Sequence, residues 1–120
     1  MKRETFFETV AGTAINREII DKVQQAYGTV LPAEVQKILS ISPQGEFIDG
    51  ANFCRLLSAK EILNASAELH VDFTKHGFIP VFDIEDNNFV VFDFKNGSWK
   101  NFNIVDEVPY GGQPSLDAII

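Results

Sequence analysis

The segment from Phe78 to Ile104 constrains the fold of this 120-residue chain more than any other. It holds six of the 11 Phe residues and the only Trp. Two groups of turn-forming residues, at 85–88 (Glu-Asp-Asn-Asn) and 95–98 (Lys-Asn-Gly-Ser), interrupt its apolar runs. Asn and Gly tolerate the positive φ of tight hairpin turns, and β-branched and aromatic residues favour strands. The pattern therefore predicts a three-stranded antiparallel meander.

Apolar residues at helical spacing predict two helices near the N-terminus. The first covers roughly 15–27 and ends at Gly28, a residue suited to a left-handed C-terminal cap. The second opens at Leu31-Pro32, because Pro is favoured in a first helical turn, and ends at Ser42-Pro43. Two short helices joined by a tight turn are expected to pack on a larger element.

Between these helices and the meander, the sequence predicts short strands and a third helix. The strands are EFID (46–49) and ANFCRLL (51–57), placed around the turn signal Asp49-Gly50. Ser58 and Glu61 have the spacing of a capping box, which predicts a helix over about 59–71.

The order of these elements predicts the fold class. Helices followed by an antiparallel or mixed sheet, with the helices on one side, indicate an α+β fold. The length suits one domain over 1–120. Residues 1–14 are expected to form an N-terminal extension and 109–120 a C-terminal tail, of which 115–120 is apolar enough to dock as a last helical turn.

Two-residue turns centred on Asp86-Asn87 and Asn96-Gly97 would assign alternate residues of the meander to opposite faces. One face is then almost wholly apolar, with Asp93 opposite Lys100 as a cross-strand ion pair. This predicted core face contains Phe78, Pro80, Phe82, Ile84, Phe89, Val91, Asp93, Lys100, Phe102 and Ile104. The other face mixes large aromatic with polar side chains, and its candidate partner-binding residues are Asp83, Phe92, Phe94, Trp99, Asn101 and Asn103.

Two interpretations of the mixed face remain open. Aromatic rings interspersed with Asn and Asp are typical of a recognition patch, and the same patch would also suit a homodimer interface. Alternatively, a helix or the C-terminal tail covers Phe92, Phe94 and Trp99 and forms a second small core. A three-residue loop at Asn96-Gly97 would exchange the faces of the third strand.

Charge and composition limit the classes of partner. Seventeen acidic and ten basic residues give a net charge of −7, which argues against binding to nucleic acid because phosphate contacts require clusters of Lys and Arg. A basic protein partner is compatible with this charge, and so is a simple role in solubility. No apolar run approaches the length of a signal peptide or membrane span, so we expect a cytoplasmic protein without a membrane partner.

Carboxylates crowd the first predicted hairpin but do not predict an acid–base pair. In the register above, Asp83 and Asp93 project to opposite faces, whereas a glycosidase pair must face one cleft. Glu85 and Asp86 fit a solvated turn. The sequence therefore predicts no catalytic carboxylate.

Other chemical motifs are equally weak. The sequence His70-x-Asp72-x-x-x-His76 has no fixed ligand geometry for a metal, and the lone Cys54 lies in a predicted strand without a basic neighbour, as expected of a buried inert thiol. Gly111-Gly112 does not lie between a strand and a helix, where a phosphate loop would be. We expect a non-enzymatic protein with neither cofactor nor metal.

Three segments resemble the SUKH superfamily, which includes fungal cell-wall (glucan) synthesis regulators and many bacterial immunity proteins. They are Tyr27-Gly-Thr-Val-Leu-Pro-Ala-Glu-Val35, similar to the family's G-x-x-LP-x-E junction, then Ile79-Pro-Val-Phe82 and Asn88-Phe-Val-Val-Phe-Asp-Phe94. The resemblance covers most of residues 15–108, and Trp99 matches an aromatic position after Gly-x-x. Asp86-Asn87-Asn88 stands where many members have a Gly-rich turn.

The resemblance implies an α+β domain that binds another protein without catalysis. Bacterial members are thought to neutralise toxins, often nucleases, and the acidic charge of this chain would suit a basic toxin domain. The fungal members imply an alternative, a regulatory or scaffold domain.

Overall fold

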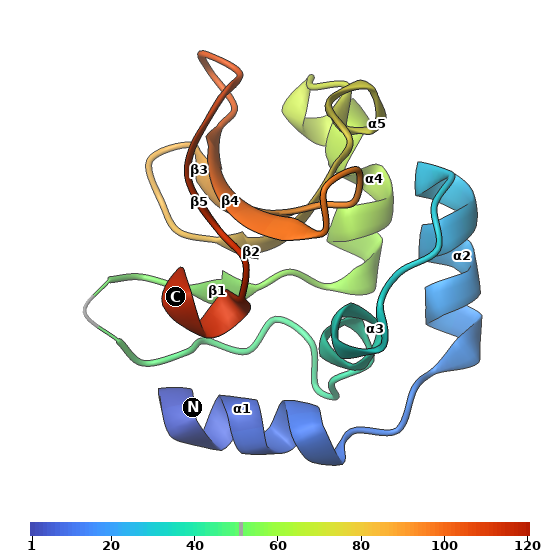
Figure 1. Cartoon of the computed structure of the whole chain (residues 1–120), viewed down its shortest axis with the longest axis vertical. Coiled ribbons are helices and arrows are strands. Elements are labelled where there is room, and N and C mark those ends of the chain that lie inside the picture. Colours follow the sequence, from blue (N-terminus) through green and yellow to red (C-terminus); the bar gives the residue numbers. More distant parts are fainter. Residues whose placement is uncertain (51) are drawn as a thin grey trace.

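The computed structural model describes residues 1–50 and 52–120 (Figure 1). Its elements, in chain order, are α1 (Arg3–Gly12), α2 (Arg17–Tyr27), α3 (Ala33–Leu39), β1 (Arg55–Leu56), α4 (Ala59–Leu69), α5 (Phe73–His76), β2 (Phe78–Asp83), β3 (Asn88–Asp93), β4 (Ser98–Asn103), β5 (Val108–Gln113) and a 3-10 helix (Leu116–Ala118). The predicted α+β fold is confirmed.

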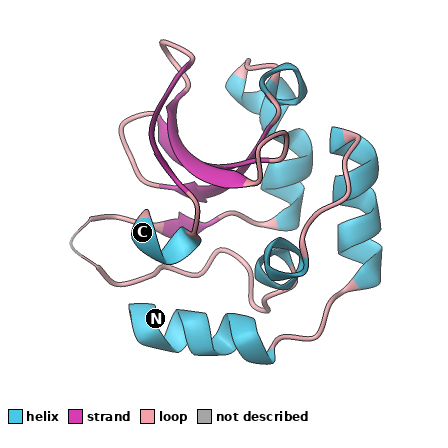
Figure 2. Ribbon diagram, in the orientation of Figure 1, coloured by secondary structure: helices cyan, strands magenta, loops and turns pink. Residues whose placement is uncertain are grey.

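The five strands form one antiparallel sheet in the order β1-β2-β3-β4-β5. Strands β2, β3 and β4 are the predicted meander. In Figure 2 the strands curve over one side of the molecule, α2–α5 flank them, and α1 runs below. No helix of the described part of the chain combines the length and apolarity needed to cross a membrane.

The predicted helices form where their end signals lie. Asn16 caps α2 by accepting a hydrogen bond from the Ile19 N–H, and Gly28 ends α2 with a φ of 66°. The capping box of α4 is present, since Ser58 accepts from the Glu61 N–H and the Glu61 carboxylate accepts from the Ser58 N–H. The helix ends at Leu69, two residues earlier than predicted, where His70 adopts a left-handed conformation.

The segments predicted as an N-terminal extension (1–14) and a C-terminal tail (109–120) both contain regular elements that pack in the fold. Helix α1 buries Phe6 and Val10. Residues 108–113 form β5, which pairs with β4 through Tyr110 and Asn101. The expected last helical turn is confirmed as the 3-10 helix, which buries Leu116 and lies beside α1 (Figure 1).

The two strands expected between 46 and 57 are reduced to β1 and isolated bridges. Phe47 pairs with Arg55, and Asp49 pairs with Lys2 of the N-terminal segment. Ala51 of the predicted ANFCRLL strand lies outside the described residues. The Ile48 N–H donates to the Cys54 carbonyl and the Leu56 N–H to the Glu46 carbonyl, so the two arms of this segment remain joined.

The hairpin turns are longer than predicted. Residues 94–97 form a four-residue loop in which the Gly97 N–H donates to the Asp93 carbonyl. Asp93 therefore pairs with Ser98, and Lys100 pairs with Val91. The β3–β4 register differs from the predicted one by two positions. Because side chains alternate with a period of two, every residue of β3 and β4 keeps its predicted face.

A bulge between Pro80 and Phe82 changes the first hairpin. Phe82 pairs with Val90 and therefore lies on the face of Trp99, and Asp83 pairs with Phe89 and lies on the face of Asp93. Both assignments are opposite to the predicted ones. The extra residue of a bulge reverses the alternation beyond it, and the sequence of β2 carries no signal for this.

Both faces of the sheet are covered. On one face Phe102 packs edge-on against Phe73 of α5, with ring centroids 5.9 Å apart. On the other face Phe82 packs against Phe6 of α1 at 5.8 Å and against Trp99 at 6.4 Å. Part of this second face is not covered by α1, and there the candidate site lies.

Candidate functional site

A pocket of about 570 Å³ lies on the second face, beside the β2–β3 turn. Its floor is a row of paired residues, Val90 of β3, Asn101 of β4 and Tyr110 of β5. Its walls are formed by residues 48–50 and 52–54, by the turn residues 84–86, and by Ile119 and Ile120. Its volume is in the range of sites that hold a small molecule or a few side chains.

Carboxylates line the pocket from two segments. Glu85 and Asp86 come from the β2–β3 turn, and Asp49 comes from the loop opposite. Glu85, Asp86 and Asn87 adopt φ values of 74°, 54° and 64° in succession. Asp and Asn tolerate this left-handed conformation, whereas Glu adopts it rarely, and the three residues together make the tight β2–β3 turn.

Aromatic side chains flank the same pocket. Phe53 lines it and packs edge-on against Phe47, with ring centroids 5.3 Å apart, and Phe47 is 52% exposed. Tyr110 is 46% exposed, and its hydroxyl donates a hydrogen bond to Asn88 Oδ1 at 2.9 Å. Large apolar groups held at the surface beside carboxylates are typical of a surface that binds a partner.

Arg3 is the basic residue of the pocket lining. Its guanidinium donates hydrogen bonds to the backbone carbonyls of Ile120 and Asp117 and lies 5.0 Å from the centre of the Phe7 ring. Arg3 therefore joins α1 to the 3-10 helix, and its donors are directed at the backbone rather than at the carboxylates of the pocket.

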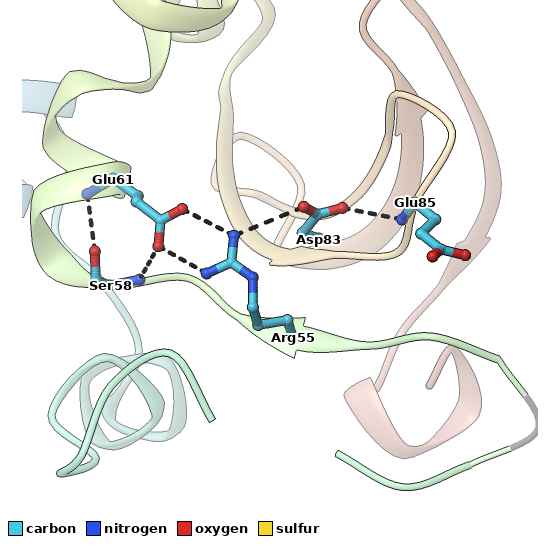
Figure 3. A network of polar contacts seen from close by, with 5 residues as sticks. All are labelled: Arg55, Ser58, Glu61, Asp83 and Glu85. Atoms are coloured by element: carbon cyan, nitrogen blue, oxygen red, sulfur yellow. Dashed lines mark hydrogen bonds and ion pairs between the residues drawn. The ribbon is translucent and has the colours of Figure 1, made fainter. Parts of the chain in front are cut away.

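A network of polar contacts fixes the turn that carries Glu85 (Figure 3). Arg55 donates two hydrogen bonds to Glu61, at 2.9 and 2.8 Å, and lies 3.6 Å from Asp83. Asp83 in turn accepts a hydrogen bond from the Glu85 N–H at 2.9 Å. The Glu85 carboxylate points away from Arg55 in Figure 3, so the network holds its backbone and leaves its side chain for the pocket.

The Arg55 hydrogen bonds also set the ionisation of Glu61. They are the largest influence and, together with the donated Ser58 N–H, they outweigh burial and lower the pKa of Glu61 to about 2. Glu61 is therefore charged under all ordinary conditions.

Two of the predicted partner-binding residues are in the core. Phe92 and Trp99 are each 3% exposed and pack edge-on against one another, with ring centroids 5.1 Å apart. The open aromatic face predicted there is wrong, and the alternative of a covered second core holds. The reason is that α1 and the 3-10 helix bury Phe6 and Leu116 in the same core.

The other four predicted residues have different positions. Asn101 lines the pocket, whereas Asp83 contacts Arg55 on the opposite face. Asn103 donates to Asn88 Oδ1 and accepts from the backbone of the β4–β5 turn. Phe94 is half-buried in the β3–β4 turn, where its N–H donates to the Gly77 carbonyl. Of the six, the structure brings only Asn101 to the pocket.

The predicted opposite placement of Asp83 and Asp93 was also wrong. The bulge puts both on one face, but their partners on β3 and β2 place them at opposite ends of the hairpin, roughly 13 Å apart along the strand. Each is engaged, Asp83 with Arg55 and Asp93 with Lys100. The pair does not face one cleft.

The surroundings of His76 and Cys54 fit structural roles rather than chemical ones. Asp72 caps α5, and His76 stacks on Phe78 and contacts Glu107 at 3.0 Å. Burial, with a smaller effect of the Asp83 charge, raises the pKa of the Cys54 thiol to about 11. Within residues 1–50 and 52–120, no three His, Cys, Asp or Glu side chains are grouped so as to hold a metal ion.

Sequence reasoning missed most of the pocket. Phe47 and Phe53 were assigned to strands, and Glu85 and Asp86 were interpreted as turn residues only. One signal was present: Phe47 and Phe53 lie within three residues of the Asp49-Gly50 turn signal on either side, a pattern that suits a loop folding back on itself. Tyr110 could not be found, because it was placed in a tail.

No protein-family model matches the chain, and the search of curated proteins finds no match. The fold and the pocket are therefore the basis for a function.

Proposed function

We propose that this protein is a non-enzymatic binding module, an immunity-type protein that neutralises a basic toxin domain, such as a nuclease. The observation that carries the proposal is the composition of one surface, which we call the pocket face: the pocket with Asp49, Glu85 and Asp86, and the aromatic residues Phe47, Phe53 and Tyr110. It replaces the face around Phe92 and Trp99 as the proposed contact surface.

The energetics of interfaces support this assignment. Binding energy is concentrated in a few aromatic or arginine residues that enter pockets of the partner, surrounded by polar groups. Phe47 and Phe53 contact one another edge-on, so they form one apolar projection. Ordering them on binding therefore costs less conformational entropy than ordering two independent side chains.

Charge supports the basic character of the partner. The chain has a net charge of −7. The pocket face carries the carboxylates of Glu85, Asp86 and Asp49, of which Asp49 lies 3.9 Å from the N-terminal ammonium. Arg3 is engaged with backbone carbonyls. Opposite charges on the partner would accelerate association and reject acidic competitors.

The resemblance to the SUKH superfamily supports the class of function. The segment Tyr27–Val35 forms the junction of α2 and α3, and Ile79–Phe82 and Asn88–Phe94 form β2, β3 and the following turn. The resembling residues thus lie in the scaffold, and the pocket face consists of loops around it. Loops on a rigid scaffold commonly carry specificity.

The proposal is tested by searching the neighbouring genes for a toxin domain and by tagged pull-down, and then by assaying the toxin domain so identified against this chain. Co-expression should restore growth of cells that produce the toxin, and calorimetry should give a 1:1 complex. The double variant F47A/F53A should weaken binding by on the order of 100-fold or more. Val30→Ala is the matched control, because Val30 is 83% exposed in the α2–α3 loop and does not line the pocket.

Two other outcomes would change the proposed function or the proposed binding surface. Stable binding to a protein that has no toxic activity would favour the regulatory or scaffold role. Toxin binding that F47A/F53A leaves unchanged would reject the pocket face while keeping the immunity function.

A further inference from the structure

We propose that the pocket receives an arginine side chain of the protein partner, an inference that rests on the proposed function. The pocket lies between two loops and its floor is the sheet, so a side chain can enter from the partner without any change in the strands. Its volume of about 570 Å³ exceeds one side chain, which leaves room for the residues that flank an arginine in a loop.

The lining matches the two parts of an arginine. Val90, Ile84 and Ile119 supply apolar surface for the aliphatic stem. The carboxylates of Glu85 and Asp86 supply acceptors for the guanidinium, which binds carboxylates through paired hydrogen bonds. Asp49 is already paired with the N-terminal ammonium at 3.9 Å.

Aromatic rings favour a guanidinium over an ammonium group. Phe53 lines the pocket from the segment 52–54, and Tyr110 lines it from β5. A planar guanidinium can stack on such rings while it donates to carboxylates in its own plane, which a lysine ammonium cannot do.

The pocket also has an amide available to a ligand. The side chain of Asn101 lies on the floor and makes no hydrogen bond to another residue of the described ranges, whereas the neighbouring Asn88 side chain is engaged by Tyr110 and Asn103. Arg3 does not neutralise the acidic lining, because its donors are directed at the carbonyls of Ile120 and Asp117.

The test uses the full chain, labelled with 15N, and the capped peptide acetyl-Gly-Arg-Gly-amide. Chemical shifts should change at residues 53–54, 84–90, 101 and 110, with millimolar affinity. A peptide with citrulline, which is isosteric and neutral, should bind on the order of tenfold more weakly. The variant E85Q/D86N should lose binding, and the control E68Q/D106N, with the same change of net charge outside the pocket, should retain it.

Several results would overturn the inference. These are equal binding of the arginine and citrulline peptides, shifts spread over acidic residues outside the pocket, or unchanged binding by E85Q/D86N. Failure of this inference is separable from failure of the proposed function. If a toxin binds E85Q/D86N as tightly as it binds the parent chain, the arginine-binding role of the pocket is rejected and the immunity function is not. If the arginine peptide binds but no toxin partner exists, the immunity function is rejected and the arginine-binding role is not.

Discussion

The Lys100 ammonium lies 2.7 Å from the Asp93 carboxylate, although the two residues are not paired directly across the strands. Lys100 reaches Asp93 diagonally, and Asp93 is 2% exposed. The same carboxylate accepts hydrogen bonds from the N–H groups of Lys95 and Asn96 and from the Asn96 side chain. Asp93 thus holds the β3–β4 turn.

Replacing this carboxylate should destabilise the protein. We expect Asp93→Ala to lower the free energy of unfolding by about 2–4 kcal/mol, because four donors lose their partner and the Lys100 charge loses its counterion. Denaturant unfolding measures the change. Asp106→Ala, at an exposed position of the β4–β5 turn, is the control, and an equal loss in both variants would contradict the role of Asp93.

Stability should decrease in acid because two carboxylates have lowered pKa values. Burial acts to raise the pKa of Asp93, but the hydrogen bonds from Lys100 and Asn96 outweigh it and lower that pKa. The pKa of Glu61 falls from 4.5 to about 2. Between pH 4.5 and about pH 2 the unfolded chain therefore binds more protons than the folded chain does. The stabilisation present above pH 4.5 is lost as the pH falls towards 2.

Unfolding measured at several pH values tests this dependence. Glu61→Gln should flatten the decrease, whereas Glu68→Gln, an exposed residue of the same helix, should not. A parent protein whose stability is constant from pH 6 to pH 3 would contradict the lowered pKa values.

The capping box of α4 gives a third prediction. Ser58→Ala removes an acceptor for the Glu61 N–H and should cost about 1 kcal/mol of unfolding free energy. Ser115→Ala is the matched control, since Ser115 precedes the 3-10 helix without a side-chain cap hydrogen bond. Equal effects of the two substitutions would show that the Ser58 cap contributes nothing specific.

The packing of α1 gives a fourth prediction. Phe6 is 1% exposed and contacts Phe82, so Phe6→Ala should cost about 3–5 kcal/mol. Phe47→Ala, at a ring that is 52% exposed, should cost far less. If Phe6→Ala were tolerated as well as Phe47→Ala in denaturant unfolding, α1 would not be part of the core.

Elements with strong local sequence signals could be predicted from the sequence. Gly28, the Ser58–Glu61 capping box and the Phe-rich meander each act within a few residues, and their elements form as predicted. The Asp93–Lys100 ion pair was also predicted correctly, because a register error of two positions preserves the faces and long side chains span the diagonal.

The parts that were not predictable depend on distant contacts. Strand β5 contains Pro109 and two glycines and forms because β4 offers a free edge. The bulge in β2 moves Phe82 to the other face, and α1 covers it there. Consequently Phe92 and Trp99 are buried, and the exposed site moves to the loop and turn residues around the pocket.

The decisive measurement is a calorimetric titration of a toxin domain, identified from a neighbouring gene or by pull-down, with the parent chain, with F47A/F53A and with Val30→Ala. We expect a 1:1 complex with the parent chain, unchanged binding by Val30→Ala, and loss of affinity by on the order of 100-fold or more in the double variant. All three proteins should have similar unfolding free energies, because Phe47 and Val30 are exposed and Phe53 is only half-buried. Equal affinity of all three proteins would contradict the assignment of the pocket face as the binding surface.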